Sequence, residues 1–249
     1  MSRYDLTGRK VLITGGSSGI GYVIAQTFAE AGADVTILAH VDEVHDAAKK
    51  LSAETGRSVA AIKGDVRDRP WLADKIGALD RIEVLINNAG GGEPTPIDDP
   101  APDAAEKFDA ILAVNVTGVY NVTREALKKM TEGGRIIITS SIWGKTAEPE
   151  WSAYVAAKHA VIGFMRCLAK ELGPRGISVN CVCPGSTATE TNLRVLPPDT
   201  LALVKSQMWL RPDLIPPSHI ANAFLFLASD AGSEITGQAL NVDRGQFAA

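Results

Sequence analysis

The chain has 249 residues, of which 45% are hydrophobic and 22% are charged, and its formal net charge is −4. These values suit a globular protein with a sizeable core, which we expect to be one domain over residues 1–249. They argue against a nucleic-acid partner, because such a protein needs a basic surface to neutralise phosphates. No apolar run is long enough to cross a membrane. The first ten residues are too polar for a secretory signal, so we expect a cytoplasmic protein without a membrane partner.

Short β-like apolar runs alternate with segments of helical periodicity along the chain. The β-like runs are Lys10–Thr14, Asp34–Ala39, Val59–Gly64, Val84–Ile86, Arg135–Ser140, Ser178–Val182 and Ala239–Val242. The helical segments are Gly19–Ala31, Val41–Thr55, Phe108–Met130, Ser152–Leu172 and Ile220–Ala228. Because the runs lack short hairpin turns, the order predicts right-handed βαβ crossovers. The sequence therefore predicts an α/β, Rossmann-like, doubly wound parallel sheet of about seven strands with helices on both faces.

The first predicted strand ends in a glycine-rich turn, Thr14-Gly15-Gly16-Ser17-Ser18-Gly19-Ile20-Gly21, and a helix follows at once. Glycine lets the backbone bend tightly and approach a pyrophosphate closely. The helix N-terminus offers free N–H groups and the positive end of the helix dipole. We therefore predict a dinucleotide site here. Its residues are Gly15, Ser17, Ser18, Gly19, Ile20 and Gly21. A plain tight turn is the alternative interpretation.

The end of the second predicted strand bears on the choice of dinucleotide. An acidic residue at this position binds the ribose hydroxyls of NAD and disfavours the 2′-phosphate of NADP. Ala39 stands there instead, and His40 follows it. His40 is a weaker phosphate ligand than arginine, and Asp42 and Glu43 add negative charge nearby. Ser18 stands where many NADP enzymes have another basic residue, so that support is absent. We favour NADP narrowly over NAD, and a simple loop role for His40 stays open.

The spacing of the glycines in the turn resembles the short-chain dehydrogenase/reductase family, and further motifs of that family follow along nearly the whole chain. They are Asp65-Val66, Asn87-Asn88-Ala89-Gly90, Asn115, Ser141, Tyr154-Val155-Ala156-Ala157-Lys158, Pro184-Gly185 and Thr189. The resemblance implies further cofactor-binding residues. These are Asp65, Val66, Asn88, Ala89, Gly90, Tyr154, Lys158, Pro184, Gly185, Thr187 and Thr189. It also implies a homotetramer, built through two long helices and the C-terminal region.

The Tyr-x-x-x-Lys spacing places Tyr154 and Lys158 on one face of a helix. A phenol with a pKa near 10 is a poor base at neutral pH, and we expect the ammonium of Lys158 to lower that pKa. Tyr154 then exchanges a proton with a carbonyl or an alcohol, while a nicotinamide handles the hydride. Ser141 stabilises the substrate oxygen. The resemblance gives Asn115 a supporting role through water. A surface pair and a strand-ending serine are the ordinary alternatives.

Two stretches look like loops, Gly91–Pro102 and Ser186–Pro217. The second is too long for a plain connection, so we predict a substrate loop over residues 186–217. Apolar side chains gather in it and beside the predicted catalytic residues. They are Trp143, Trp151, Leu193, Val195, Leu196, Leu201, Leu203, Met208, Trp209 and Leu210. Such a setting suits a bulky apolar or aromatic ketone and its secondary alcohol. Packing of loop helices or of a subunit interface accounts for the same residues equally well.

Other functions share these motifs. A 3-oxoacyl-carrier-protein reductase would carry them all and would need a basic patch for its acidic carrier. Arg124, Lys128, Lys129 and Arg166 supply part of such a patch, or are ordinary surface charges. A non-catalytic, nucleotide-sensing protein of the same fold is an alternative of another class, although such relatives commonly lose the tyrosine or the lysine. Epimerases and dehydratases of the superfamily are usually longer.

The three cysteines, Cys167, Cys181 and Cys183, are few and odd in number, as is usual in a reducing compartment. Cys181 and Cys183 alternate along a β-like run, and no cluster of histidine or cysteine lies near them in the sequence. We predict buried structural thiols and no metal site.

Overall fold

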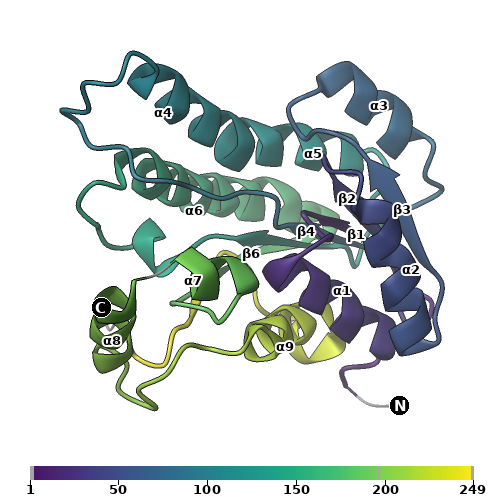
Figure 1. Cartoon of the computed structure of the whole chain (residues 1–249). Coiled ribbons are helices and arrows are strands. Elements are labelled where there is room, and N and C mark those ends of the chain that lie inside the picture. Colours follow the sequence, from purple (N-terminus) through teal and green to yellow (C-terminus); the bar gives the residue numbers. More distant parts are fainter. Residues whose placement is uncertain (1–2, 196, 248–249) are drawn as a thin grey trace.

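The computed structural model describes residues 3–195 and 197–247. Its centre is a seven-stranded parallel sheet in the order β3-β2-β1-β4-β5-β6-β7 (Figure 1). The strands are β1 Lys10–Thr14, β2 Asp34–Ala39, β3 Val59–Lys63, β4 Val84–Asn87, β5 Arg135–Thr139, β6 Ser178–Pro184 and β7 Ala239–Val242. The predicted α/β class and the doubly wound parallel sheet are confirmed. The strand order reverses between β1 and β4, which is where ligands bind in open sheets of this kind.

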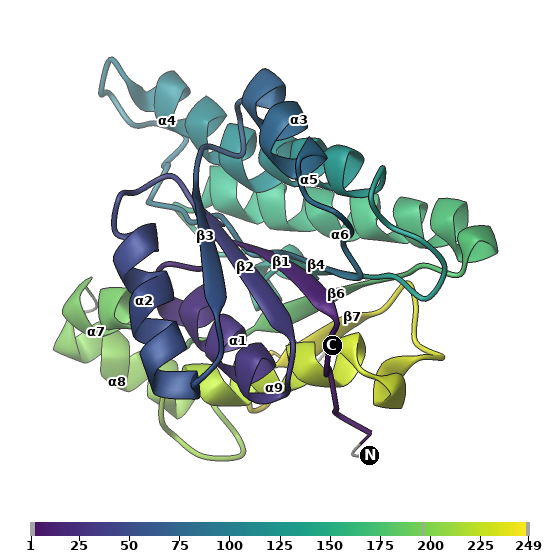
Figure 2. The ribbon, with the colours of Figure 1, turned by 90° about the vertical axis from the view of Figure 1, so that its right-hand side faces the viewer.

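Helices cover both faces of the sheet and enclose two apolar cores, one on each face (Figure 2). The first face carries α1 Gly19–Glu30, α2 Val44–Thr55 and α9 Pro217–Ala228. The second face carries α3 Arg69–Gly77, α5 Val119–Ala126 and α6 Ser152–Leu172. Central strands such as β4 are buried along their whole length. This explains their continuous apolar sequence, because a parallel sheet covered on both faces has no polar side.

The predicted helix Phe108–Met130 is wrong in detail. The structure begins it earlier as α4 Ala104–Leu112, continues it through a π-helical segment Ala113–Gly118, and ends it as α5 at Ala126. Within the π segment, the side-chain Nδ2 of Asn115 donates to the carbonyl of Ile111 at 2.9 Å. In a regular α-helix that carbonyl accepts the backbone N–H of residue 115. Such a π segment is frequent at functional sites.

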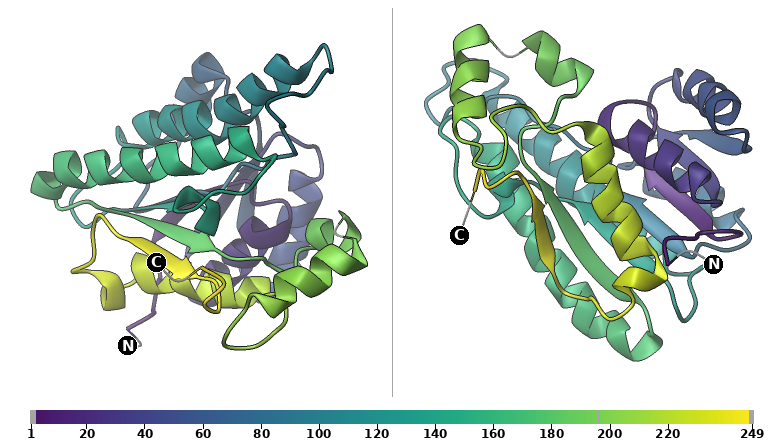
Figure 3. Two further views of the ribbon diagram at one scale, coloured as in Figure 1. Left: turned by 90° about the vertical axis from the view of Figure 1, so that its left-hand side faces the viewer. Right: turned by 90° about the horizontal axis from the view of Figure 1, so that it is seen from below.

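Three α-helices of the described residues were not predicted. α3 has little amphipathic periodicity, but it carries a start signal, because Asp68 accepts a hydrogen bond from the Trp71 N–H and Pro70 stands in its first turn. The segment 186–217 is not a plain loop either. It contains α7 Glu190–Val195 and α8 Pro198–Ser206, which lie outside the sheet at one end of the molecule (Figure 3). Proline starts α8 and α9 rather than breaking them.

No helix among the described residues is long and apolar enough to span a membrane.

Candidate active site

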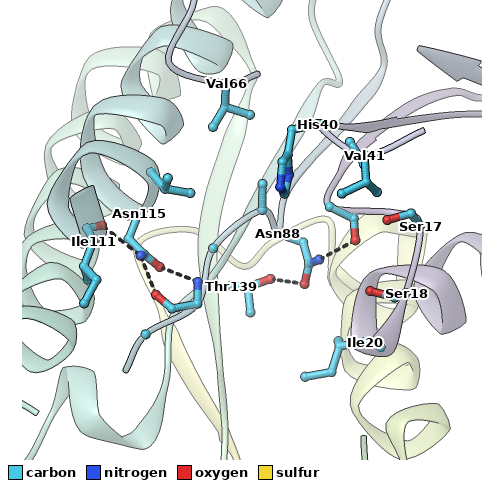
Figure 4. Close-up of a pocket in the computed structure, with 18 of the residues that line it drawn as sticks. Ser17, Ser18, Ile20, His40, Val41, Val66, Asn88, Ile111, Asn115 and Thr139 are labelled. Atoms are coloured by element: carbon cyan, nitrogen blue, oxygen red, sulfur yellow. Dashed lines mark hydrogen bonds between the residues drawn. The ribbon is translucent and has the colours of Figure 1, made fainter. Parts of the chain in front are cut away.

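A cavity of about 680 Å³ opens at the strand ends around the switch point between β1 and β4 (Figure 4). Most of the residues singled out in the sequence line it. They are Gly15, Ser17, Ser18, Gly19, Ile20, His40, Asp65, Val66, Asn88, Ala89, Gly90, Asn115, Tyr154, Lys158 and Thr189. Residues far apart in the chain therefore meet in one cavity, as expected where the carboxyl ends of parallel strands converge.

The turn before α1 is built to receive an anion. Ser18 is the N-cap of α1, yet its side chain makes no capping hydrogen bond, and the first turn of the helix holds no acidic residue. The N-terminal N–H groups and the positive end of the dipole are thus left for a ligand. These features fit the pyrophosphate of a dinucleotide.

Gly21 does not line the cavity but lets α1 pack against the turn. A Cβ at this position would overlap the carbonyl oxygen of Gly15 and would lie 2.5 Å from Nδ2 of Asn88. Any larger residue would therefore push the helix N-terminus away from the turn.

A chain of hydrogen bonds joins the turn to the predicted catalytic lysine. Nδ2 of Asn88 donates to the Gly15 carbonyl at 3.2 Å, and its Oδ1 accepts from Thr139 Oγ1 at 3.1 Å (Figure 4). The carbonyl of Thr139 in turn accepts from Lys158 Nζ at 3.0 Å. Thr14 Oγ1 also accepts the backbone N–H of Asn88 at 3.0 Å. Three strand ends are therefore held in one arrangement.

Lys158 is 4% exposed, and its Nζ lies 5.2 Å from the ring centroid of Tyr154. Loss of hydration penalises the charged form. Burial accordingly lowers the pKa of Lys158 to about 8. Lys158 is thus still protonated at neutral pH, but it loses its proton at a lower pH than a lysine on the protein surface does.

Tyr154 is half-buried and is flanked by two tryptophan rings. Its ring centroid lies 6.0 Å from that of Trp143 and 6.2 Å from that of Trp151, both with edge-to-face geometry. Burial raises the pKa of Tyr154 to about 12, and a hydrogen bond with Ser141 opposes this only in part. The expectation that Lys158 lowers this pKa was wrong, because desolvation dominates it and the opposing contribution comes from Ser141, not from the lysine.

Asn115 holds the loop after β4. Its Nδ2 donates to the Gly91 carbonyl at 2.8 Å and its Oδ1 accepts from the Gly91 N–H at 3.3 Å (Figure 4). The side chain is 1% exposed. Its amide therefore links the π segment to the loop that borders Tyr154.

The far end of the cavity carries two basic side chains. His40 lines it from the end of β2, and Arg67 lines it from the turn after β3. The guanidinium of Arg67 binds the carboxylate of Asp65 with contacts of 2.6 and 3.0 Å. This interaction lowers the pKa of Asp65, so that its carboxylate stays charged and remains ion-paired with Arg67.

The structure does not bring every predicted residue to the cavity wall. Ser141 stands beside Tyr154, and its Oγ accepts the Trp143 N–H at 3.1 Å. Pro184 ends β6 and Gly185 follows it, and the buried Thr187 donates to the Gly185 carbonyl at 2.9 Å. None of these four is among the described residues that line the cavity.

The apolar residues of the predicted substrate loop spread in different directions. Met208 is buried in the core. The side chains of Leu193, Leu203, Trp209 and Leu210 are exposed to solvent. Leu196 and the side chain of Val195 lie outside the described residues.

The sequence interpretation missed other cavity residues. They are Leu38, Val41, Gly64, Arg67, Gly91, Gly92, Glu93, Ala110, Ile111, Val114, Thr139 and Thr191. Ala39, which the sequence analysis placed at the cofactor-selecting position, lines the cavity too. Arg67 had a signal, since it directly follows the Asp65-Val66 motif. Thr139 had one too, as a polar residue ending a buried strand. The others lie beside residues that the motifs identified.

The three cysteines differ in their exposure. Cys181 and Cys183 are buried, as predicted, whereas Cys167 is exposed and its Sγ contacts Oε1 of Glu171 at 3.1 Å. Among the residues that the structure describes, no three histidine, cysteine or acidic side chains gather as a metal site.

Known proteins resemble this chain over nearly its whole length. A family model described as enoyl-(acyl carrier protein) reductase matches residues 15–246. A 3-oxoacyl-[acyl-carrier-protein] reductase, FabG, from Chlamydia trachomatis is 36% identical, with 96% of this chain and 98% of the relative covered. Glucose 1-dehydrogenase from Gluconobacter oxydans is 36% identical, covering 96% and 91%. A crystal structure of a short chain dehydrogenase from Burkholderia cenocepacia in complex with NADP superposes with a TM-score of 0.88 at 34% identity, covering 98% and 99%.

Gly21→Ala tests whether the glycine-rich turn over residues 14–21, from here on the phosphate turn, binds the cofactor. The added Cβ meets the Gly15 carbonyl, and overpacking of this kind costs ~1–3 kcal/mol. We expect the dissociation constant of the nicotinamide cofactor to rise roughly tenfold or more, measured by fluorescence titration. Gly77→Ala is the matched control, because a Cβ there meets nothing within 4 Å. Unchanged cofactor affinity in Gly21→Ala would contradict the role given to the turn.

Lys158→Met tests the cost of the buried ammonium. Below pH 8 the lysine is protonated in both the folded and the unfolded chain, so the full penalty of burial is present. The shift of the Lys158 pKa from 10.5 to about 8 means that burying the ammonium lowers the free energy of unfolding by ~3 kcal/mol at most. The variant also loses the hydrogen bond to the Thr139 carbonyl, which reduces its gain in stability by ~1 kcal/mol. We therefore expect a higher melting temperature for the variant at pH 7.

The pH dependence of the melting temperature is the control for the comparison of Lys158→Met with the wild type. Between pH 8 and 10 the folded lysine loses its proton before the unfolded one does, so the wild type gains stability as the pH rises. The difference in melting temperature between Lys158→Met and the wild type should shrink over this range. A constant difference would mean that the ammonium is not destabilising.

Proposed function

The chain belongs to the short-chain dehydrogenase/reductase family, and we propose that Tyr154, Lys158, Ser141 and Asn115 carry its reaction. The protein is an NAD(P)-dependent oxidoreductase that acts on CH–OH groups and the corresponding carbonyls. The alternative of a non-catalytic, nucleotide-sensing protein is thereby set aside. The observation that supports the residue roles is that the phosphate turn, Tyr154 and Lys158 border one cavity.

Tyr154 is the proton donor in carbonyl reduction. Its raised pKa keeps the phenol protonated at neutral pH, so a proton is available for a carbonyl oxygen. The hydrogen bond with Ser141 favours the phenolate that remains. Lys158 is the cation next to it, with Nζ 5.2 Å from the centre of the Tyr154 ring. A bound reduced nicotinamide supplies the hydride. Asn115 supports the site through Gly91, and its predicted link to Lys158 through water stays a prediction.

NADP is the preferred cofactor. His40 and Arg67 line the end of the cavity next to β2 and β3, and both can carry positive charge toward a 2′-phosphate. Asp65, the carboxylate beside them, is bound by Arg67. Ala39 leaves no acidic side chain at the usual NAD-selecting position. The NADP complex of the Burkholderia relative is consistent with this preference.

The substrate is a neutral, bulky apolar or aromatic ketone, or its secondary alcohol. Trp143 and Trp151 flank Tyr154 and offer flat apolar surface next to the reacting hydroxyl. The segment 186–217 contributes to the substrate site through Thr191, which lines the cavity next to Thr189 of the predicted cofactor contacts. Glu93 lines it as well, and its carboxylate disfavours an anionic substrate.

A 3-oxoacyl-carrier-protein reductase is the second candidate, favoured by the Chlamydia relative. The family model has an acyl carrier protein in its description too, although it describes an enoyl reductase. Two features weigh against this second candidate. Glu148 and Glu150 are exposed just before α6, close in sequence to Tyr154, and would repel an acidic carrier. On the expected docking face, Lys128 is paired with Glu125 at 2.6 Å.

We also propose that the chain folds as one domain and assembles into a homotetramer. The exposed side chains of Tyr120 on α5 and of Leu240 on β7 are candidates for burial between subunits. Sedimentation of the protein distinguishes a tetramer from a dimer.

A substrate panel tests the proposed reaction. We expect NADPH-dependent reduction of aryl and cyclic ketones at rates well above those for acetoacetyl thioesters, followed by absorbance at 340 nm. Tyr154→Phe should lower turnover by about 10²–10⁴-fold while cofactor binding is retained. Near-normal turnover in Tyr154→Phe would contradict the mechanism. Preference for the carrier-linked thioester would instead support the second candidate.

The cofactor preference has its own test. His40→Asp replaces a cationic or neutral group by an anion, so we expect kcat/KM with NADPH to fall roughly tenfold or more while kcat/KM with NADH is retained or rises. Lys63→Gln is the control, because Lys63 also lies at this end of the sheet but does not line the cavity. An equal effect of His40→Asp on both cofactors would argue against contact with the 2′-phosphate.

A further inference from the structure

The catalytic helix α6 lacks a cap of its own. Its N-cap residue is Trp151, whose side chain makes no capping hydrogen bond. Serine, threonine or aspartate usually fills this position, and its oxygen accepts one of the N–H groups that the first turn leaves without a partner. Tyr154 is the third residue of the helix, so its place depends directly on how this end is held.

Thr95, more than fifty residues earlier in the chain, supplies the missing cap. Its Oγ1 accepts the backbone N–H of Ala153 at 3.0 Å and lies 3.2 Å from Oγ of Ser152. Oγ of Ser152 donates to the Thr95 carbonyl at 2.7 Å, and the Thr95 N–H donates to the carbonyl of Glu150 at 2.5 Å. Thr95 is 6% exposed, in a loop whose other residues are mostly exposed. The backbone and the side chain of Thr95 thus both form hydrogen bonds with the start of α6.

The same loop touches the reacting side chain. A Cβ on Gly92 would lie 2.6 Å from Cδ2 and 2.9 Å from Cβ of Tyr154, so its backbone packs directly on the phenol ring. At its beginning, the loop is held by the two hydrogen bonds between Gly91 and Asn115. The segment 91–95 is therefore fixed at one end by Asn115 and at the other by Thr95, with Tyr154 between these two points.

We propose that Thr95 is a positioning residue for the reaction, which caps the catalytic helix from outside and so sets the position of the Tyr154 hydroxyl. This proposal rests on the proposed role of Tyr154 as proton donor. A reacting group displaced by about 1 Å can lose as much as a hundredfold in rate. The hydroxyl of Thr95 thereby affects turnover without touching the substrate.

Thr95→Val tests this role, since it keeps the shape and removes the hydroxyl. We expect kcat for ketone reduction to fall roughly ten- to a hundredfold, with the dissociation constant of NADPH within about twofold of the wild type. Thr95→Ser keeps the hydroxyl and should retain most of kcat. Should Thr95→Val fail to fold, Ser152→Ala removes the partner hydroxyl and should lower kcat in the same direction, by a smaller factor.

The matched control is Thr236→Val, which makes the same substitution and removes a similar hydrogen bond, from the Val179 N–H at 3.1 Å, near the start of β6. It should lower the melting temperature without changing kcat. A normal kcat in both Thr95→Val and Ser152→Ala would overturn the proposal, and so would an equal loss of kcat in Thr95→Ser and Thr95→Val.

A double variant separates this proposal from the proposed function. Adding Thr95→Val to Tyr154→Phe should cause no further loss of turnover, because the hydroxyl being positioned is absent. A full additional loss would overturn the positioning role. If Tyr154→Phe alone remains active, the proposed function fails. If Tyr154→Phe is inactive and Thr95→Val keeps its kcat, only the positioning role fails.

Discussion

The hydrogen bond from the buried Lys158 ammonium to the Thr139 carbonyl is the interaction around which the site is arranged. It fixes α6 against the end of β5, and Thr139 passes the connection to Asn88 and so to the glycine-rich turn before α1. A buried charge is costly unless such partners are present. The lysine therefore requires the strand ends to keep one arrangement, and that arrangement also places Tyr154 at the cavity.

Much of this architecture could be predicted because it is encoded locally. All seven strands lie within two residues of their predicted bounds, since a parallel sheet covered on both faces leaves uninterrupted apolar runs. The phosphate turn and the Tyr-x-x-x-Lys pair could be identified because each has its residues at fixed spacing. α3 was missed because its signal is a cap, at Asp68, and not an amphipathic pattern.

What could not be predicted depends on contacts between distant parts of the chain. The pairing of Thr95 with Ala153 spans 58 residues, and no spacing rule connects them. The pKa of Tyr154 depends on how much water the surrounding rings exclude, so the lowering expected from Lys158 alone had the wrong sign. Likewise, the apolar residues of segment 186–217 looked alike in sequence, but the fold buries Met208 and exposes Trp209.

The π segment Ala113–Gly118 has a consequence for the helix that contains it. A wider turn accommodates one extra residue, which rotates everything after it by roughly 100° relative to a regular α-helix. Ahead of the segment, Ile111 lines the cavity, and after it Val119 and Val122 face the core. The helix before the π segment therefore faces the cavity, and the helix after it faces the core. The π segment turns the helix so that one continuous element can do both.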